Sequence, residues 1–343
     1  AITARSVRGG GAASEVREFT TAEKPRAPVT WHVSPAGDDA ADGLAPTTAW
    51  RTPRRASFAV MAGDTVLIAP GVYHHAIAPL CGGAPDRRIS FRREGDGPAI
   101  IDGRGVVAPL VDLPGRPWVT VEGLIFDNLP RDGHPGVVYV RNAQGFELRN
   151  CRIGWSRRHG GFGNGVDLAN CPDARIEGNV IWGTRYHVTL RACPGAHVRH
   201  NTVSWGQVFA VQITGDHTGV RLANNILYYP TSVPNAAVAI AHPDADLGLT
   251  MDHNCWGPMV DGTRPVYVYA RSLNDLPVTG DTVEAWAANS GQDAHSLQAD
   301  PLFADATKGD FRLQPGSPCL GAGEGGADMG ALDPMMLAGS AGQ

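Results

Sequence analysis

The chain has 343 residues, 43% of them hydrophobic, and carries 29 Lys and Arg against 34 Asp and Glu, a formal net charge of −5 at pH 7. This acidic balance argues against nucleic acid as a partner, because nucleic-acid-binding surfaces are basic. No run of about 18 apolar residues occurs, so we expect no membrane-spanning helix and no membrane partner.

The first 29 residues are predicted to form a flexible arm, since they combine a Gly-Gly-Gly run and scattered charge with few large apolar side chains. Residues 30–343 are predicted to form one domain. Within it, the segment 31–62 contains a strand at Trp31, a turn rich in Asp and Gly, and a short amphipathic helix between Ala49 and Met61. A first coil strand, Thr65–Ala69, follows, so we expect this helix to cap the open, apolar end of a repeated structure.

A short pattern then returns along the chain: apolar, two spacers, Asn, any residue, apolar. Successive copies are 27, 28, 22, 24 and 29 residues apart. This period predicts a solenoid with coils over about 63–270. The residues at the central place of the copies are Leu124, Cys151, Asn179, Asn201, Asn225 and Asn254.

A second pattern keeps step with the first and alternates apolar, variable, apolar, as in Val138-Tyr-Val140 and Val166-Asp-Leu168. Alternation of this kind indicates a strand with one face inward. Because no helical pattern separates the strands, the predicted fold is all-β, a single-stranded right-handed parallel β-helix. Neighbouring coils of such a solenoid lie about 4.8 Å apart, so the asparagines are expected to form an internal ladder at a bend.

The end of the chain loses the period. We expect a short helix over Thr282–Asn289 within an irregular closing segment over about 271–334. Three stretches resemble the pectate-lyase-like right-handed parallel β-helix superfamily: WHVSPAGDDAADG near the start, PAIIDG, and DPLFADATKGDFRLQPGSPCLGAG near the end. The resemblance covers about 31–334 and implies the fold. It leaves the activity open, because that superfamily contains polysaccharide lyases, hydrolases, epimerases and binding proteins.

Candidate site residues follow from the alternation, which places the middle residue of each second-pattern strand outside. Insertions at 129–136 and 155–165 enlarge two coils beside this strip, and loops on one side of a solenoid usually build its binding face. Aromatic faces and arginines together favour a groove for an anionic polysaccharide. The predicted substrate-binding residues are Arg157, Arg158, His159, Arg185, Tyr139, Arg141, Gln212, Trp155, Trp182 and Trp205.

The reaction that these residues favour is β-elimination from a uronic acid. Arginine would neutralise the carboxylate, while His187 or Tyr186 removes the C5 proton. The predicted catalytic residues are His187, Tyr186, Arg191 and Asp167. No metal or other cofactor is predicted: Lys24 and Lys308 are the only lysines, and no acidic cluster repeats across adjacent coils, which argues against calcium-dependent lysine chemistry.

Other interpretations stay open. A glycoside hydrolase or an epimerase would use the same groove, although a hydrolase needs gathered carboxylates and Asp167 has no evident carboxylate neighbour. A non-catalytic glycan-binding or structural solenoid would need only the aromatic and arginine side chains, and tryptophans often fill loop cores. We expect a secreted or periplasmic protein. Cys171 and Cys193 are expected to stack on neighbouring coils as buried thiols or as a disulfide.

Overall fold

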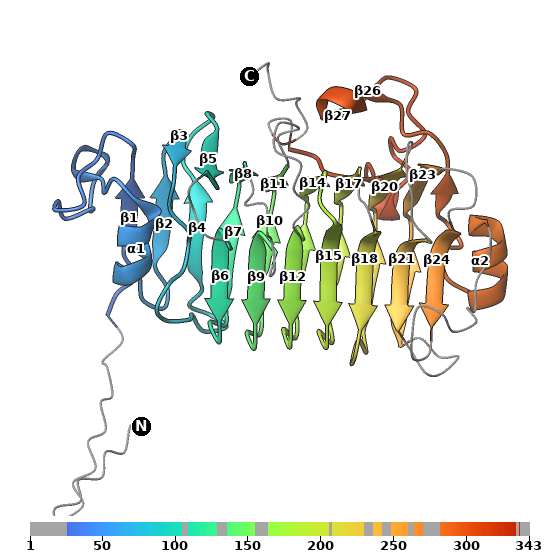
Figure 1. Cartoon of the computed structure of the whole chain (residues 1–343), viewed down its shortest axis with the longest axis horizontal. Helices are drawn as coiled ribbons and strands as arrows, with labels where there is room; N and C mark the ends of the chain where they lie inside the picture. The colour runs from blue at the N-terminus through green and yellow to red at the C-terminus, as the bar shows by residue number, and fades with distance from the viewer. Residues whose placement is uncertain are drawn as a thin grey trace, which may run out of the picture.

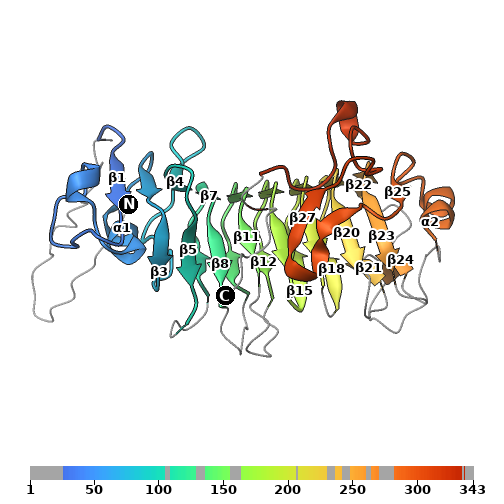
Figure 2. The ribbon, with the colours of Figure 1, turned by 90° about the horizontal axis from the view of Figure 1, so that it is seen from above.

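The fold is a parallel β-helix whose coils stack along the long axis of the molecule (Figures 1 and 2). The computed structural model describes residues 26–104, 109–128, 136–154, 164–205, 208–229, 236–241, 248–259, 264–269, 282–333 and 336. Among these residues, no helix is long and apolar enough to cross a membrane. The stacked parallel strands confirm the predicted right-handed parallel β-helix.

Three parallel sheets, here named A, B and C, form the walls of the solenoid. Sheet A contains, in order, β1 (Thr30–Val33), β2 (Thr65–Ile68), β4 (Ile89–Arg93), β7 (Val119–Glu122), β10 (Glu147–Arg149), β13 (Arg175–Glu177), β16 (His197–Arg199), β19 (Val220–Ala223) and β22 (Leu249–Asp252). Sheet B contains β3 (Gly71–Tyr73), β5 (Ala99–Asp102), β8 (Ile125–Asp127), β11 (Arg152–Ile153), β14 (Val180–Trp182), β17 (Thr202–Ser204), β20 (Ile226–Tyr229), β23 (Cys255–Met259) and β25 (Leu297–Gln298). Sheet C contains β6 (Val111–Pro114), β9 (Val138–Arg141), β12 (Val166–Ala169), β15 (Tyr186–Arg191), β18 (Phe209–Thr214), β21 (Ala236–Ala241) and β24 (Arg264–Tyr269).

A sharp corner joins sheet A to sheet B in each central coil. One residue there adopts the left-handed conformation, with φ between +49° and +72°, which glycine and asparagine tolerate best. The next residue turns its side chain into the solenoid. The corner residues are Gly123, Asn150, Gly178, His200, Asn224 and His253.

The inward residues after these corners form the predicted Asn ladder, which consists of Asn179, Asn201, Asn225 and Asn254. Each of the first three Nδ2 groups donates to the Oδ1 atom of the next asparagine, at 3.0–3.1 Å. Every Nδ2 also donates to a backbone carbonyl of the preceding coil. The ladder satisfies polar groups that would otherwise be buried without partners.

The apolar residues of the repeat face inward, as predicted. Leu148, Ile176, Val198 and Leu222 are buried and pair in register from coil to coil. Cys171 and Cys193 are both buried free thiols, and their side chains share a hydrogen bond. The thiol interpretation of this pair is the one that holds.

The outer face of sheet A carries alternating charges along one column of register partners. Arg92 pairs with Glu122 at 3.0 Å, and Arg149 pairs with Glu177 at 3.8 Å on the following coils. Each exposed pair contributes little to stability. A slip of two residues along the strand would, however, place Arg149 opposite Arg175, so the charge pattern favours the observed register.

Helices cover both ends of the solenoid (Figure 1). At the N-terminal end, η1 (Pro46–Thr48) and α1 (Pro53–Ala59) precede β2, and Trp50 is buried with its ring stacked 4.6 Å from that of Trp31. At the C-terminal end, α2 (Val283–Ser290) lies beside β24 and buries Trp286. Both helices were expected from the sequence.

The predicted boundary of the N-terminal arm at residue 29 is too late. The carboxylate of Asp64 accepts the backbone N–H of Val29 at 2.9 Å and pairs with Arg26, so 26–29 are docked against the first coil. The rest of the predicted arm, 1–25, lies outside the described residues.

The described part of the closing segment over 301–333, to which the name is restricted from here on, does not cover the end of the solenoid but runs back along the outer face of sheet B (Figure 2). It contains a hairpin of β26 (Phe303–Asp305) and β27 (Asp310–Leu313), with η2 (Ala306–Lys308) between them and η3 (Glu324–Gly326) later. Phe303 and Phe311 pack on Val180 and Ile226 in a second apolar core. Asp333 reaches Arg93 of β4 at 3.3 Å.

Candidate functional site

The strip predicted on the outer face of sheet C has the expected register, but the side chains of Asp167 and Thr189 are buried rather than exposed. Tyr139, Asp167, Thr189 and Gln212 are register partners on successive strands, and Asp112 precedes Tyr139. Arg141 and Arg191 stand two residues further along their strands. We call these seven residues the sheet C strip.

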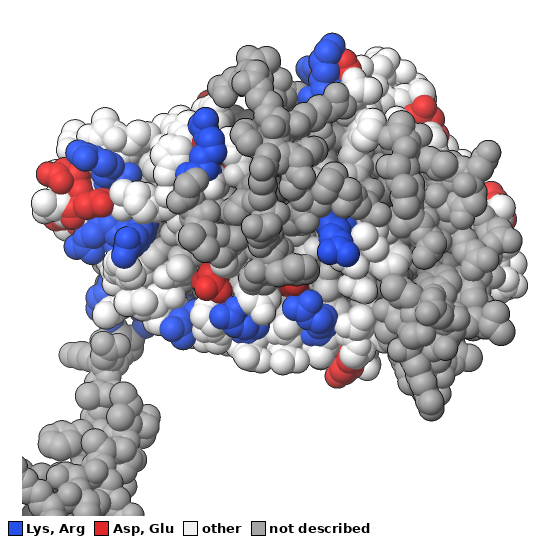
Figure 3. Space-filling model, viewed as in Figure 1, with Lys and Arg blue, Asp and Glu red and all other residues white. Residues whose placement is uncertain are grey.

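Both arginines of the sheet C strip are already paired. Arg191 makes two contacts with the Asp167 carboxylate of the preceding coil, at 2.6 and 3.2 Å. Arg141 likewise reaches back one coil, to Asp112 at 3.6 Å. The Arg141 guanidinium also lies 4.5 Å from the centre of the Tyr139 ring. Acidic and basic side chains are interspersed on the described part of this face (Figure 3). The strip therefore offers no net positive field for a substrate carboxylate.

His187 is not on an exposed surface, contrary to the expectation from alternation. Its side chain is fully buried, and Nε2 lies 2.8 Å from the carbonyl oxygen of Ser204. Burial lowers the pKa of His187 to about 4, because a buried imidazolium loses its hydration. The ring is thus neutral at pH 7 and donates to a backbone carbonyl, which is a structural contact.

The two described tryptophans of the predicted groove lie elsewhere. Trp182 and Trp205 both pack against the core beneath the closing segment, where Trp182 meets Phe311 edge-on at 6.1 Å. They fill the outer side of sheet B because their strands end there. The predicted residues Trp155, Arg157, Arg158 and His159 lie outside the described residues.

Arg185 and Tyr186 lie at the start of β15, beside the sheet C strip. Arg185 is exposed, and its guanidinium lies 5.4 Å from the centre of the Tyr186 ring. Tyr186 is half-buried and its ring tilts against Phe209 at 6.0 Å. Both predicted residues are therefore at the surface of the coil that carries Arg191.

Two carboxylates at the C-terminal ends of neighbouring strands of sheet B were not predicted from the sequence. Asp102 ends β5, Asp127 ends β8, and the two are register partners on neighbouring coils. Partners in a parallel sheet have backbones about 4.8 Å apart. The signal was the phrase Ile-Ile-Asp102 followed by Ile-Phe-Asp127, which repeats at the same place in consecutive coils.

The two carboxylates have different environments. Arg104 holds Asp102 through its backbone N–H at 2.8 Å and its guanidinium at 2.6 Å, and although burial opposes the effect, these contacts lower the pKa of Asp102. Burial, aided by the charge of Asp102, raises the pKa of Asp127. One ionised carboxylate thus lies beside one that binds a proton more tightly, which is how acid and base roles are separated in many active sites.

No protein-family model matches the chain. The alpha-1,3-galactosidase A of Akkermansia muciniphila is 28% identical over 121 residues, which cover 32% of this chain and 20% of that protein. The chain thus spans about a fifth of the length of this curated relative.

Solved structures superpose on most of the chain at low sequence identity. XylC with xylose matches 73% of this chain and 72% of its own, with a TM-score of 0.48 and 12% identity. Pectate lyase Pel9A matches 89% and 96%, with a TM-score of 0.44 and 13% identity. A rhamnogalacturonan lyase matches 84% and 93%, with a TM-score of 0.40 and 12% identity. The chain resembles these proteins in its right-handed parallel β-helix.

Proposed function

We propose that this chain is a carbohydrate-active enzyme that hydrolyses a glycosidic bond at the Asp102–Asp127 pair. The observation that carries the proposal is the register of two carboxylates on neighbouring coils, with Arg104 bound to only one of them. Carboxyl groups about 5–5.5 Å apart serve retaining glycosidases, and the spacing of about 4.8 Å between the backbones of neighbouring coils is compatible with such a separation. The name of the curated relative, a galactosidase, also favours hydrolysis.

The two carboxylates would have separate roles. Asp127, whose pKa is raised, donates a proton to the leaving glycosidic oxygen. Asp102 stays ionised and stabilises the positive charge that develops on the sugar. Water then adds to the anomeric carbon and returns a proton to Asp127, which completes the hydrolysis.

The sheet C strip would hold the sugars next to the bond that breaks. Asp102 and Asp127 lie on the coils that carry Asp112 and Tyr139, since β5 leads into β6 and β8 into β9. Tyr139 offers a flat face, and Gln212 offers hydrogen bonds further along the strip. Because Arg191 and Arg141 are paired, the proposed substrate is a glycan without a strict requirement for uronic acid.

A second candidate reaction is elimination, as the sequence first indicated. One contact favours it: the exposed Arg185 guanidinium lies 5.4 Å from the Tyr186 ring. In that reaction Arg185 would neutralise a uronate and Tyr186 would remove the C5 proton. The bond from C4 to the glycosidic oxygen would then break, and the leaving oxygen would take a proton from water. Arg191 would assist, at the cost of its contact with Asp167.

The test is a panel of neutral and anionic polysaccharides with two readouts, reducing ends and the ultraviolet absorbance of the unsaturated elimination product. Hydrolysis gives reducing ends without that absorbance. On the substrate found, Asp127→Asn should lower kcat at least about 100-fold, since it removes the proton donor. The control Asp310→Asn changes a partly buried carboxylate of β27 that lies outside the proposed site and should keep parental activity.

Other results would contradict the hydrolase. One such result is an unsaturated product that is lost in Tyr186→Phe and kept in Asp127→Asn. It would assign the reaction to elimination at Arg185 and Tyr186. Glycan binding without either product would assign a non-catalytic binding role.

A further inference from the structure

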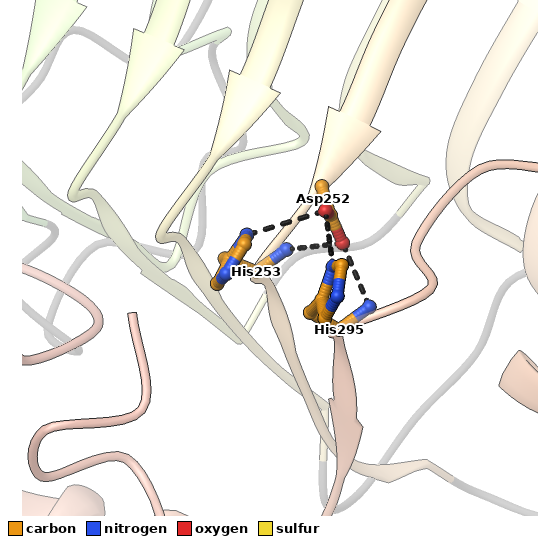
Figure 4. A group of neighbouring side chains, drawn as sticks. All are labelled: Asp252, His253 and His295. Atoms are coloured by element: carbon orange, nitrogen blue, oxygen red, sulfur yellow. Dashed lines mark hydrogen bonds and ion pairs between the residues drawn. The ribbon is translucent and has the colours of Figure 1, made fainter. Parts of the chain in front are cut away.

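The last coil carries one carboxylate and two imidazoles that the proposed glycan site does not use. Asp252 ends β22, His253 occupies the corner that follows, and His295 lies between α2 and β25 (Figure 4). One nitrogen or oxygen atom from each side chain lies within 4.8 Å of the others. The cluster lies near the C-terminal end of the solenoid, whereas Asp102 and Asp127 lie near its N-terminal end.

Backbone contacts orient the carboxylate of Asp252. Its Oδ1 atom accepts the N–H groups of His253 at 2.9 Å and His295 at 2.8 Å. The other oxygen, Oδ2, lies 2.8 Å from Nδ1 of His295 and 3.3 Å from Nδ1 of His253. Carboxylates that bind metals in proteins are oriented in this way, with one oxygen fixed by hydrogen bonds and the other facing the ion.

His295 is held in place by the residues on either side of it. Asp293 accepts the Nδ2 group of Asn254 at 3.1 Å, and Ser296 Oγ accepts the Asn254 N–H at 2.8 Å. The ring of His295 stacks on that of His253 at 4.9 Å. The cluster is therefore preorganised, and the 68% exposure of the His295 side chain leaves it open to solvent.

The separations suit a small metal ion. Neighbouring ligands of a tetrahedral zinc ion, each about 2.0–2.2 Å from the metal, are roughly 3.3 Å apart. Two imidazole nitrogens and one carboxylate oxygen favour zinc and similar transition metals, whereas calcium and magnesium prefer oxygen ligands only. Arg199 and Arg221, on the two preceding strands of sheet A, are paired with Glu324 at 3.4 and 2.5 Å.

We propose that Asp252, His253 and His295 bind a divalent transition-metal ion that links the segment between α2 and β25 to the last coil. The two histidines bind as neutral rings protonated at Nε2, and water fills the remaining position. The ion joins β22 to a segment 43 residues later in the chain. Closing a long loop in this way restricts the unfolded chain and stabilises the native state.

The experiment is a zinc titration of the full chain, freed of metal with a chelator, followed by calorimetry and thermal unfolding. We expect saturable binding of one ion and an upward shift of the Tm. Loss of an outer contact to a metal ligand already costs 10–100-fold in affinity, so His295→Ala should weaken the zinc Kd at least about 100-fold and abolish the Tm shift.

The matched control is His32→Ala. His32 lies 3.5 Å from Glu94 but belongs to no group of three potential metal ligands among the described residues, so this variant should bind zinc like the parent. Asp252→Asn tests the carboxylate while keeping its shape. Circular dichroism in chelator shows whether each variant is folded, and Co²⁺ in place of zinc gives visible absorption bands that report a nitrogen and oxygen ligand set.

Two results would overturn the proposal. The first is a parental chain whose zinc Kd is weaker than about 1 mM. The second is a folded His295→Ala variant that binds zinc as tightly as the parent, because the ion would then lie at another site.

Discussion

The side chain of Asn201 makes four hydrogen bonds inside the ladder. Its Nδ2 group donates to Ile176 O at 2.7 Å and to Asn225 Oδ1 at 3.1 Å, and its Oδ1 atom accepts two bonds from Asn179, both at 3.0 Å. Asn201→Ala leaves these buried partners unsatisfied, so we expect a loss of about 4 kcal/mol in the free energy of unfolding. Urea unfolding measures it.

The control for the ladder is Gln144→Ala, which removes an exposed hydrogen bond to Asp173. Its effect should stay within about 0.5 kcal/mol, as is usual for surface positions. Equal losses in the two variants would mean that the ladder adds no special stability.

His187 gives a prediction with a defined pH window. Its pKa is about 4 in the folded chain, against 6.5 for an ordinary histidine, so between these values the unfolded chain binds a proton that the folded chain does not. The contribution of His187 to the free energy of unfolding is therefore complete above pH 6.5. It declines by roughly 3 kcal/mol as the pH falls towards 4. His187→Gln cannot titrate and should lack that part of the decline.

The measurement is urea unfolding of parent and variant at about pH 7.5 and about pH 4.5. The same variant should keep glycan turnover at the higher pH, because His187 is buried. Lost turnover in a stable His187→Gln chain would restore it as a catalytic base.

At the scale of single elements, Arg152 ties the closing segment to sheet B. Its guanidinium donates to Met336 O at 2.6 Å and to Gly309 O at 3.0 Å, and it lies 5.5 Å from the Trp182 ring. Arg152→Met should loosen this segment and speed amide hydrogen exchange over 303–313 while the coils stay protected. Mass spectrometry reads that exchange.

Arg312→Met is the matched control, since Arg312 lies on β27 but is exposed and pairs only locally with Asp310. It should leave the exchange of this region unchanged. Uniformly faster exchange across the coils in Arg152→Met would instead show that the segment and the coils unfold together.

The features that could be predicted from the sequence are those that the repeat and local patterns determine. The Asn ladder, the register of Asp167 with Thr189, and the two end helices follow from spacing and local pattern. The path of the closing segment is not periodic and could not be predicted. Trp182 and Trp205 were therefore assigned to a groove, although they pack beneath the closing segment. The pairing of Arg191 with Asp167 depends on side-chain geometry two residues off register, which alternation does not determine.

At the scale of the whole molecule, the closing segment links coils that otherwise contact only their neighbours. It touches Arg93 near the start of the solenoid and Ile226 near its end. A chain truncated after Asp300 should lose this link and expose Val180 and Cys255, so its unfolding should broaden into several steps. Circular dichroism and tryptophan fluorescence would then give different midpoints in urea, whereas coincident curves would argue against the link.

The ladder also has a direction. The Nδ2–H groups of Asn179, Asn201 and Asn225 all donate towards the C-terminal end, so their carboxamide dipoles align and add, as peptide dipoles do in a helix. The positive pole meets Asp293, which accepts from Asn254 and from Trp286. A buried carboxylate there completes an electrostatic column along the axis. Coils can therefore be added or lost within the column, provided that an acceptor remains at its end.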